Sequence, residues 1–276
     1  MRQRVEYVRF AELQRTPLSI PGLSAGLTAA RLSHDTESGA ATYFVNAAPM
    51  WIHREAGAFN TEVEILVVGG DLSIGSATLE RGSYIDIGCG EVHGTISSKG
   101  GCAFLLMFAG QVRFTPVNSA SEPERVQRIF AMPWGESPGY EGRSKQETPP
   151  GLSVKFLRRD SSTGAYTLIT RHAPNWYDPK LESHETWEEL ILIDGDYLMG
   201  TSGMVTGGTY IFRNGDIPHG PQASKTGAVW FARGNREINF DYSEVDWAQP
   251  MIDTYLSRTD LFENPEAFSP FGEWKS

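Results

Sequence analysis

Two histidines and two acids stand close together in a part of the chain where apolar runs alternate with turn residues. Glu182, His184 and Glu188 fall within one short stretch, and His219 ends a second run that begins at Gly208. Imidazole and carboxylate groups bind Fe(II), Mn(II), Ni(II) and Zn(II), and two histidines with one carboxylate and open positions are typical of oxygen-activating iron sites. The residue types therefore predict a buried divalent-metal site.

Strand periodicity distinguishes two adjacent acids. Successive side chains of a strand point to opposite faces, so Glu182, His184 and Glu188 share one face if a strand continues through them, and Glu189 points away. A turn at Thr186-Trp187 would break this alternation. We expect Glu188 to bind the metal and Glu189 to be structural. The competing interpretation is that all of these are satisfied polar groups on a barrel surface.

Further side chains are candidates for a cavity beside the site. His172 is a possible extra ligand, an orienting partner of a metal-bound group or an acid-base residue, with a surface histidine as the simpler interpretation. Six more side chains would exclude water and position an organic ligand, although most are equally explained as core; they are Arg171, Trp187, Tyr197, Tyr210, Phe212 and Trp230.

The composition describes an acidic chain with enough apolar residues for ordinary cores. The 276 residues include 24 Lys plus Arg and 34 Asp plus Glu, a formal charge of -10. This charge disfavours nucleic acid and anionic membrane surfaces as partners. Cys89 and Cys102 are too few for a disulfide scaffold, so we expect a cytoplasmic protein whose thiols pack as small apolar groups, with a bridge between them as the lesser alternative. The N-terminus has no signal-peptide core, and no apolar run is long enough to span a membrane.

The chain repeats itself at an offset of 125 residues. Many positions of the first half recur in the second; among them Gly26, Asp35, Gly39 and Trp51 match Gly151, Asp160, Gly164 and Trp176. The offset then grows by one residue, so that Gly82 and His93 match Gly208 and His219. A repeat of this length predicts two copies of one domain.

Each copy consists of short runs of β-branched and aromatic residues separated by Gly, Asp and Ser, which is typical of a β-sandwich or barrel. We therefore predict an all-β protein with few short helices. Its expected parts are an N-terminal arm (1–25), a first barrel (26–110), a Pro-rich linker (111–150), a second barrel (151–234) and an aromatic tail (235–276) that packs on a barrel or on a second subunit. Helix starts are expected at Ser121 to Glu124 and at Asn264 to Glu266.

These motifs resemble those of the cupin superfamily of jelly-roll β-barrels. Glu188 and Gly195 have the spacing of its first motif, with three residues between His184 and the acid, and Gly208 to His219 has the length of its second. Glu188 to Gly195 and the closing His219-Gly-Pro are most similar to the cupin domain of ChrR-type anti-sigma factors and to the acetylacetone dioxygenase type. The resemblance implies a bicupin of two tandem barrels. It also implies the ligands His184, Glu188 and His219, with Glu182 as a fourth ligand or a catalytic base, because it stands where the family has a histidine.

The first copy lacks most of these residues. Three ligand positions carry other residues there, since Glu182, His184 and Glu188 match Gly57, Phe59 and Val63. Only His93, the counterpart of His219, remains. We expect no metal in this copy, with His93 held by hydrogen bonds and the barrel serving packing, dimerisation or as a lid. His53, which matches Asp178, offers a less favoured route to a site.

The resemblance implies a metal-dependent enzyme, and a non-haem Fe(II) dioxygenase that cleaves a small carbonyl or enolisable compound is the leading hypothesis. Mn, Ni or Zn are alternative metals. Glu182 and His172 are the candidate catalytic residues. A Lewis-acid isomerase, lyase or hydrolase and a non-catalytic small-molecule sensor remain open, although no zinc-binding anti-sigma segment precedes residue 26. The expected partners are a small-molecule substrate and a second copy of the chain in a homodimer.

Overall fold

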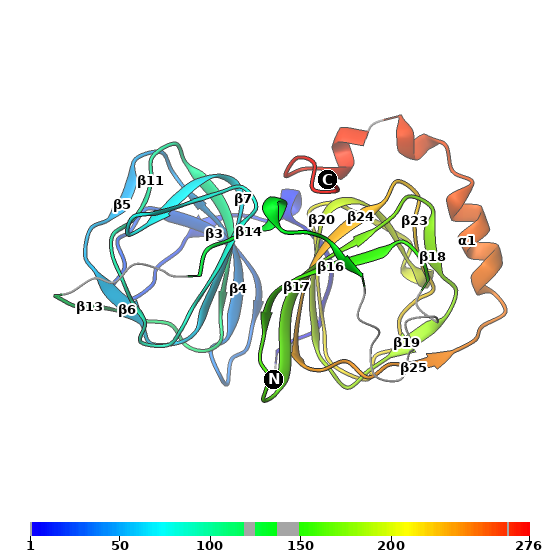
Figure 1. Cartoon of the computed structure of the whole chain (residues 1–276), viewed down its shortest axis with the longest axis horizontal. Coiled ribbons are helices and arrows are strands. Elements are labelled where there is room, and N and C mark those ends of the chain that lie inside the picture. The colour runs from blue at the N-terminus through cyan, green and yellow to red at the C-terminus, as the bar shows by residue number, and fades with distance from the viewer. Residues whose placement is uncertain (1, 119–124, 137–148, 264) are drawn as a thin grey trace. The chain divides into compact units, whose positions relative to one another are not determined.

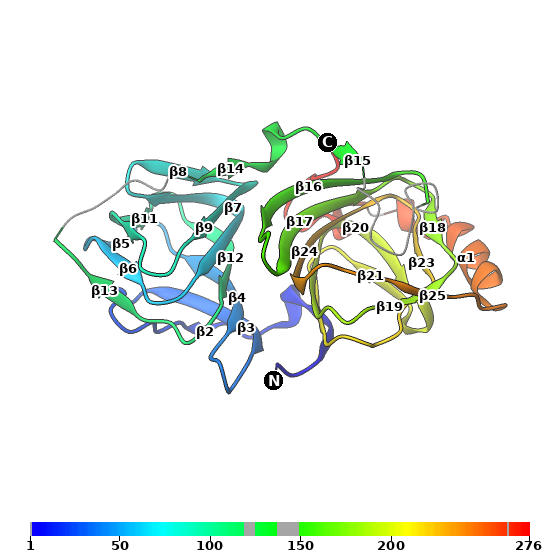
Figure 2. The same cartoon turned by 60° about the horizontal axis from the view of Figure 1, so that its bottom comes forward.

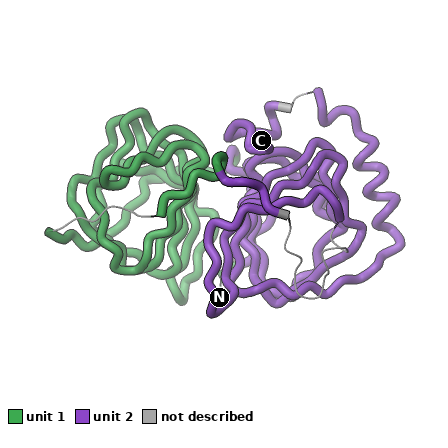
Figure 3. The backbone as a smooth tube through the Cα atoms, viewed as in Figure 1, with its two compact units in different colours: residues 1–3, 12–131 green, residues 4–11, 132–276 purple. Residues whose placement is uncertain are grey.

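The computed structural model describes residues 2–118, 125–136, 149–263 and 265–276. These residues form two compact units, the first made of residues 1–3 and 12–131 and the second of residues 4–11 and 132–276 (Figure 3). Antiparallel strands dominate both (Figure 1). The all-β prediction is therefore confirmed, whereas the helix expected at Ser121 to Glu124 falls outside the described residues.

The first unit is built around a ten-stranded sheet with the main order β14-β9-β7-β12-β4-β3-β2. A three-stranded sheet, β10-β6-β13, accompanies it. The strands are β2 (Thr16–Pro17), β3 (Leu27–His34), β4 (Ala41–Ala47), β5 (Trp51–His53), β6 (Gly57–Phe59), β7 (Val63–Ile74), β8 (Ala77–Glu80), β9 (Ser83–Ile87), β10 (Val92–His93), β11 (Ile96–Ser98), β12 (Cys102–Phe108), β13 (Phe114–Pro116) and β14 (Gln127–Arg128).

The second unit has a ten-stranded sheet with the main order β1-β22-β20-β24-β17-β16-β15 and a two-stranded sheet, β19-β25. Figure 2 shows β16 and β17 running together along one wall. The strands are β1 (Val5–Arg9), β15 (Gly135–Glu136), β16 (Leu152–Arg159), β17 (Gly164–His172), β18 (Trp176–Asp178), β19 (Leu181–Ser183), β20 (Glu188–Met199), β21 (Met204–Thr206), β22 (Thr209–Arg213), β23 (Gln222–Ser224), β24 (Ala228–Arg236) and β25 (Asp241–Ser243).

The described helices are short. The α-helix is α1 (Ala248–Leu256), and the 3-10 turns are η1 (Phe10–Glu12), η2 (Ile129–Ala131), η3 (Gly200–Ser202), η4 (Asp260–Phe262) and η5 (Pro265–Phe268). Among the described residues, no helix combines the length and the apolar character needed to cross a membrane.

The repeat of the sequence reappears strand by strand. β7 and β20 each have 12 residues and begin 125 positions apart, and β9 and β22 follow at an offset of 126. Gly70 and Gly195 occupy the same place in the two long strands. Both have a positive φ, and a Cβ atom on either would lie about 2 Å from a backbone carbonyl oxygen, so the chain requires glycine there.

Residues 4–11 of the expected N-terminal arm belong to the second unit, and residues 12–25 belong to the first, where β2 pairs with β3. β1 pairs with β22, and the Arg213 guanidinium of β22 donates to Glu6 Oε1 over 2.9 Å and to the Tyr7 hydroxyl over 2.8 Å. In the first unit the equivalent edge place, next to β9, is taken by β14. The segment 111–150, expected to be a linker, thus contributes strands to the barrels, because β13 and β14 pair within the first unit and β15 pairs with β16 in the second.

The aromatic tail packs on the second barrel. Ile252 and Tyr255 of α1 join a buried cluster with Leu198 and Ala223. The Tyr255 hydroxyl hydrogen-bonds to Asp196, and Trp274, which is 1% exposed, donates its backbone N–H to Asp194 over 2.8 Å. Two buried carboxylates of β20 therefore hold the tail in place.

Both cysteines are free thiols. Cys102 is buried in β12 and packs in the core of the first barrel, as expected. Cys89 is exposed, contrary to expectation, because it lies in the turn after β9, where its thiol donates to the Asn60 carbonyl over 3.2 Å.

Candidate metal centre

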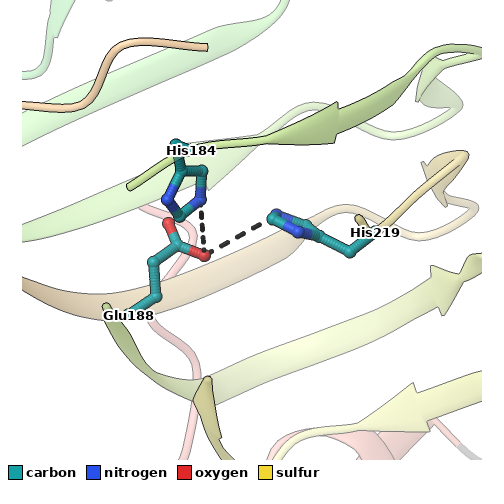
Figure 4. A group of neighbouring side chains, drawn as sticks. All are labelled: His184, Glu188 and His219. Carbon is teal, nitrogen blue, oxygen red and sulfur yellow. Dashed lines mark ion pairs between the residues drawn. The ribbon is translucent and has the colours of Figure 1, made fainter. Parts of the chain in front are cut away.

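His184, Glu188 and His219 come together in the second barrel. Their nearest ligand atoms all lie within 4.8 Å of one another, and all three residues are buried or nearly so. Nε2 of His184 is 3.4 Å and Nε2 of His219 is 3.7 Å from the same oxygen of Glu188. Figure 4 shows both rings directed at that oxygen. Among the described residues, this is the group of at least three metal-binding side chains that meets such a distance limit.

Three separate segments supply these side chains. His184 follows β19 in a bend, Glu188 begins β20, and His219 lies in the loop between β22 and β23. The assumption of one strand through residues 182–188 was therefore wrong, because the chain bends at 184–187. The gathering comes instead from an isolated bridge in which the backbones of Glu182 and His219 exchange two hydrogen bonds of 2.9 Å.

The donor set fits a divalent cation. Nδ1 of His184 is 2.8 Å from the Thr186 carbonyl, and Nδ1 of His219 is 2.9 Å from the Ile217 carbonyl. A carbonyl only accepts, so in the neutral rings both Nδ1 atoms carry the proton and both Nε2 atoms present a lone pair. Nε2 of His184 is buried, and its nearest acceptor, the Glu188 oxygen 3.4 Å away, is not placed for a regular hydrogen bond. A cation between the two Nε2 atoms and Glu188 would satisfy it.

The neighbouring charges of the site stabilise the protonated form of His184 and the ionised form of Glu188. Burial alone would lower the pKa of His184, but the Glu188 carboxylate and, behind it, Glu182 raise the pKa to about 9. Burial opposes ionisation of Glu188, yet His184 and His219 hold its pKa at about 2. Without metal, the site is therefore held together by an imidazolium and a carboxylate, and a metal must displace the proton of His184.

We expect the metal-free protein to lose stability as the pH rises from about 6.5 to about 9. The folded state holds the His184 proton more tightly than an unfolded chain with a pKa of 6.5. This contribution is fully present below about pH 6.5 and is lost as the pH passes through about 9. Urea unfolding of chelator-treated protein at about pH 6 and about pH 9.5 measures it. A His184→Gln variant should lack this part of the pH dependence, and an unchanged slope in the variant would contradict the assignment.

Glu182 lies beside the three-residue cluster and heads a chain of hydrogen bonds. Its Oε1 is 3.1 Å from Nε2 of His219 and accepts the Gln222 amide over 2.6 Å. The Tyr197 hydroxyl donates to the Gln222 oxygen over 2.7 Å and lies 3.3 Å from Nε2 of His172. Glu182 is thus fixed at the edge of the cluster, and His172 is connected to it through two intervening side chains.

A cavity of about 130 Å³ adjoins the cluster. Glu188, His219 and Glu182 line it at the metal centre, and His172 lines it as well. Apolar and aromatic side chains form most of the remaining wall; they include Leu152, Leu168, Trp176, Leu190, Trp230 and Phe240. The cavity can therefore surround an organic molecule and limit its contact with water.

Two of the six side chains proposed to line this cavity do so, namely Tyr197 and Trp230. The other four lie outside its described lining, because alternate residues of a strand face opposite ways. Arg171 stands between the inward-facing Thr170 and His172 and donates instead to the Lys275 carbonyl. Tyr210 and Phe212 flank Ile211, which faces the core, and Trp187 packs on Phe212 with ring centroids 5.6 Å apart.

Glu189 lies outside the metal cluster and has the contacts of a structural carboxylate. It is fully buried and accepts one hydrogen bond from the Tyr210 hydroxyl and one from the Arg233 guanidinium, both of 2.6 Å. Its counterpart in the first barrel, Glu64, accepts a bond of 2.6 Å from Tyr84, the counterpart of Tyr210. The same acid-tyrosine pair thus serves both barrels, with and without the metal cluster.

The first barrel fills the equivalent region with aromatic side chains. Phe59 lies 5.3 Å, ring to ring, from both His93 and Phe114. His93 has its Nδ1 3.1 Å from the Gly94 carbonyl, and His53 accepts the backbone N–H of Ser24 over 3.2 Å. These residues make a packed core, and the absence of metal from this barrel stays a prediction.

Gln222 was missed from the sequence, although the repeat held a signal for it. Gln222 stands where the first copy has Ile96, just as Tyr197 replaces Leu72 and His172 replaces Ala47. Polar residues in one copy against apolar residues in the other would have marked the whole chain of hydrogen bonds. Phe240 lies beyond the residues compared in the sequence, yet the strand pairing gives it a counterpart, because Tyr242 pairs with Glu182 as Pro116 pairs with Gly57, which places Phe240 where the first barrel has Phe114.

The described architecture is that of a cupin, with a candidate metal centre in the second of its two barrels. A protein from Nostoc punctiforme that carries only a provisional dioxygenase assignment is 18% identical, with a TM-score of 0.73 over 86% of this chain and 83% of that chain. A variant of the Bacillus subtilis oxalate decarboxylase is 12% identical, with a TM-score of 0.52 over 96% of this chain and 86% of that chain. These likenesses confirm the cupin fold.

The chain belongs to the family described as a domain of unknown function, DUF4437, whose model matches residues 8–241. The match spans both barrels. No curated protein matches the chain.

Proposed function

We propose that the second barrel is the active site of a non-haem Fe(II) dioxygenase that cleaves a small carbonyl or enolisable compound. The observation that carries the proposal is the convergence of two histidine Nε2 atoms and Glu188 at the wall of a largely apolar cavity. Two histidines and one carboxylate leave coordination positions open, as oxygen-activating iron sites require. The proposal also follows the similarity of the motifs to the acetylacetone dioxygenase type, and the provisional assignment of the Nostoc relative agrees with it.

Each group of side chains would have its own role in the proposed reaction. His184, Glu188 and His219 would hold the iron, which supplies electrons to oxygen and polarises a carbonyl oxygen. Glu182, held by Gln222 beside His219, would take a proton from the carbon next to that carbonyl. The aromatic walls would position the substrate and keep water away. A homodimer remains part of the proposal.

Metal analysis and oxygen uptake test the proposal together. Protein purified without chelator should hold about one metal ion per chain and consume oxygen with some member of a panel of diketones and aromatic ketones. Protein without stoichiometric metal would refute it. Metal with no oxygen uptake would favour a second candidate, a Lewis-acid isomerase, lyase or hydrolase, for which the placement of a carboxylate base beside the cluster is the supporting observation.

Replacing Glu182 by Gln separates its two possible roles. If Glu182 is the catalytic base, Glu182→Gln should leave the metal content unchanged and lower kcat about 10²- to 10⁴-fold. Proton transfer by a positioned group typically contributes that much to the rate. The Gln222 hydrogen bond can persist, since the substituted amide still offers an acceptor oxygen. Metal content and turnover are measured on the same preparation. Loss of the metal would make Glu182 a ligand instead.

A further inference from the structure

The chain of hydrogen bonds from Glu182 fixes where each proton lies. A carboxylate only accepts, so Glu182 faces the Gln222 amide N–H and turns the Gln222 oxygen toward Tyr197. The Tyr197 hydroxyl gives its one proton to that oxygen. Its own oxygen must then accept from Nε2–H of His172, 3.3 Å away. His172 therefore carries its proton on Nε2 and a lone pair on Nδ1.

Two polar atoms of residues that line the same cavity have no hydrogen-bond partner among the described residues. Nδ1 of His172 and Nε1 of Trp176 are both buried and unbonded. The two rings lie 4.3 Å apart, centroid to centroid, and both line the cavity. One atom is an acceptor and the other a donor. Buried polar atoms are nearly always bonded, so such a pair is expected to meet a bound molecule.

The matching positions of the first barrel carry no such pair of unbonded polar atoms. Trp51, the counterpart of Trp176, donates its Nε1–H to the Ala25 carbonyl over 2.9 Å. The place of His172 is taken by Ala47. The unmet donor and acceptor of this pair thus have no equivalent at the matching positions of the first barrel, so the fold itself does not require them.

We propose that the cavity binds a hydroxylated aromatic compound and recognises it through one hydroxyl group. That hydroxyl donates to Nδ1 of His172 and accepts from Nε1–H of Trp176, because a hydroxyl is donor and acceptor at once. The apolar walls suit a ring. Among the described lining residues none is Lys or Arg, so no ammonium or guanidinium group there would balance a small dianion. The inference rests on the proposed function for one point only, that the reacting carbonyl of this compound faces the metal cluster.

The matched pair 4-hydroxyacetophenone and acetophenone tests the inference. Both are titrated calorimetrically into the protein with its metal, under argon, so that binding is measured without turnover. We expect acetophenone to bind about tenfold more weakly, the combined effect of two lost hydrogen bonds that are each worth about threefold. Trp176→Phe keeps an aromatic ring and removes the N–H, and His172→Phe removes the acceptor. Each should reduce the difference between the two ligands to less than about threefold. Trp51→Phe, the matched control in the first barrel, should preserve it.

Several results would overturn the inference. These are failure of 4-hydroxyacetophenone to bind at millimolar concentration, equal binding of the two ligands to the unaltered protein, or an equal loss of both in Trp176→Phe. A different result would refute the proposed function alone. Tight hydroxyl-dependent binding without oxygen uptake would refute the dioxygenase and leave the recognition of the hydroxyl standing.

Discussion

Replacing His219 by Ala is expected to abolish metal binding by the whole chain. His219 supplies one of the two Nε2 atoms that face Glu188, and it comes from a different loop than His184. Loss of a mere orienting partner of a metal ligand typically costs about 10- to 100-fold in affinity, so loss of the ligand itself should cost more than about 100-fold. Elemental analysis after dialysis against a limited metal concentration gives the result.

His93→Ala is the matched control, because His93 is the counterpart of His219 in the first barrel. Its ring packs against Phe59 and Phe114, and the substitution should lower stability while metal content stays at the level of the unaltered protein. If His93→Ala removed the metal and His219→Ala retained it, the metal would have to be assigned to the other barrel.

Glu189→Ala is expected to lower the free energy of unfolding by about 3–5 kcal/mol. The substitution leaves the Arg233 guanidinium, which is mostly buried, without its carboxylate partner, and the breaking of a buried ion pair typically costs this much. The neighbouring change Glu188→Gln should instead remove the metal, and at about pH 9.5, where the His184 proton is mostly lost, it should alter the stability of the metal-free protein far less. Urea unfolding of chelator-treated variants compares the two directly.

A double replacement checks the physical reason for that loss. Glu189→Leu combined with Arg233→Met removes both charges, and stability should recover toward that of the unaltered protein, since a buried ion pair is often replaceable by apolar residues of similar volume. If the single and double variants were equally unstable, the unpaired Arg233 charge could not be the cause.

The repeat made most of the fold predictable. It aligned residues 63–71 of β7 with residues 188–196 of β20 and placed Gly70 and Gly195 at the same position of the two strands. The places where prediction failed are short strands. β13, β14 and β15 have only two or three residues each, too few for a pattern of alternation, and a proline-rich composition concealed them.

The metal cluster was predictable for a reason that differs from the one first given. His184, Glu188 and His219 stand at motif spacings, and the structure brings them together, yet the strand expected to align two of them is interrupted. Side-chain direction was harder to predict. β22 is buried along its whole length, so hydrophobicity does not reveal that Ile211 faces the core cluster while Tyr210 turns to Glu189.

The pairing of β1 with β22 joins segments about 200 residues apart. At a synthesis rate of about 5 to 20 residues per second, β1 would leave the ribosome roughly 10 to 40 s before its partner strand. All residues of the first barrel have been made by residue 131, so it can fold in that interval, whereas the second barrel cannot close until the chain has been made past His219. The barrel with the metal cluster therefore matures last, and an N-terminal fusion that hinders β1 would delay its closure without affecting the other barrel.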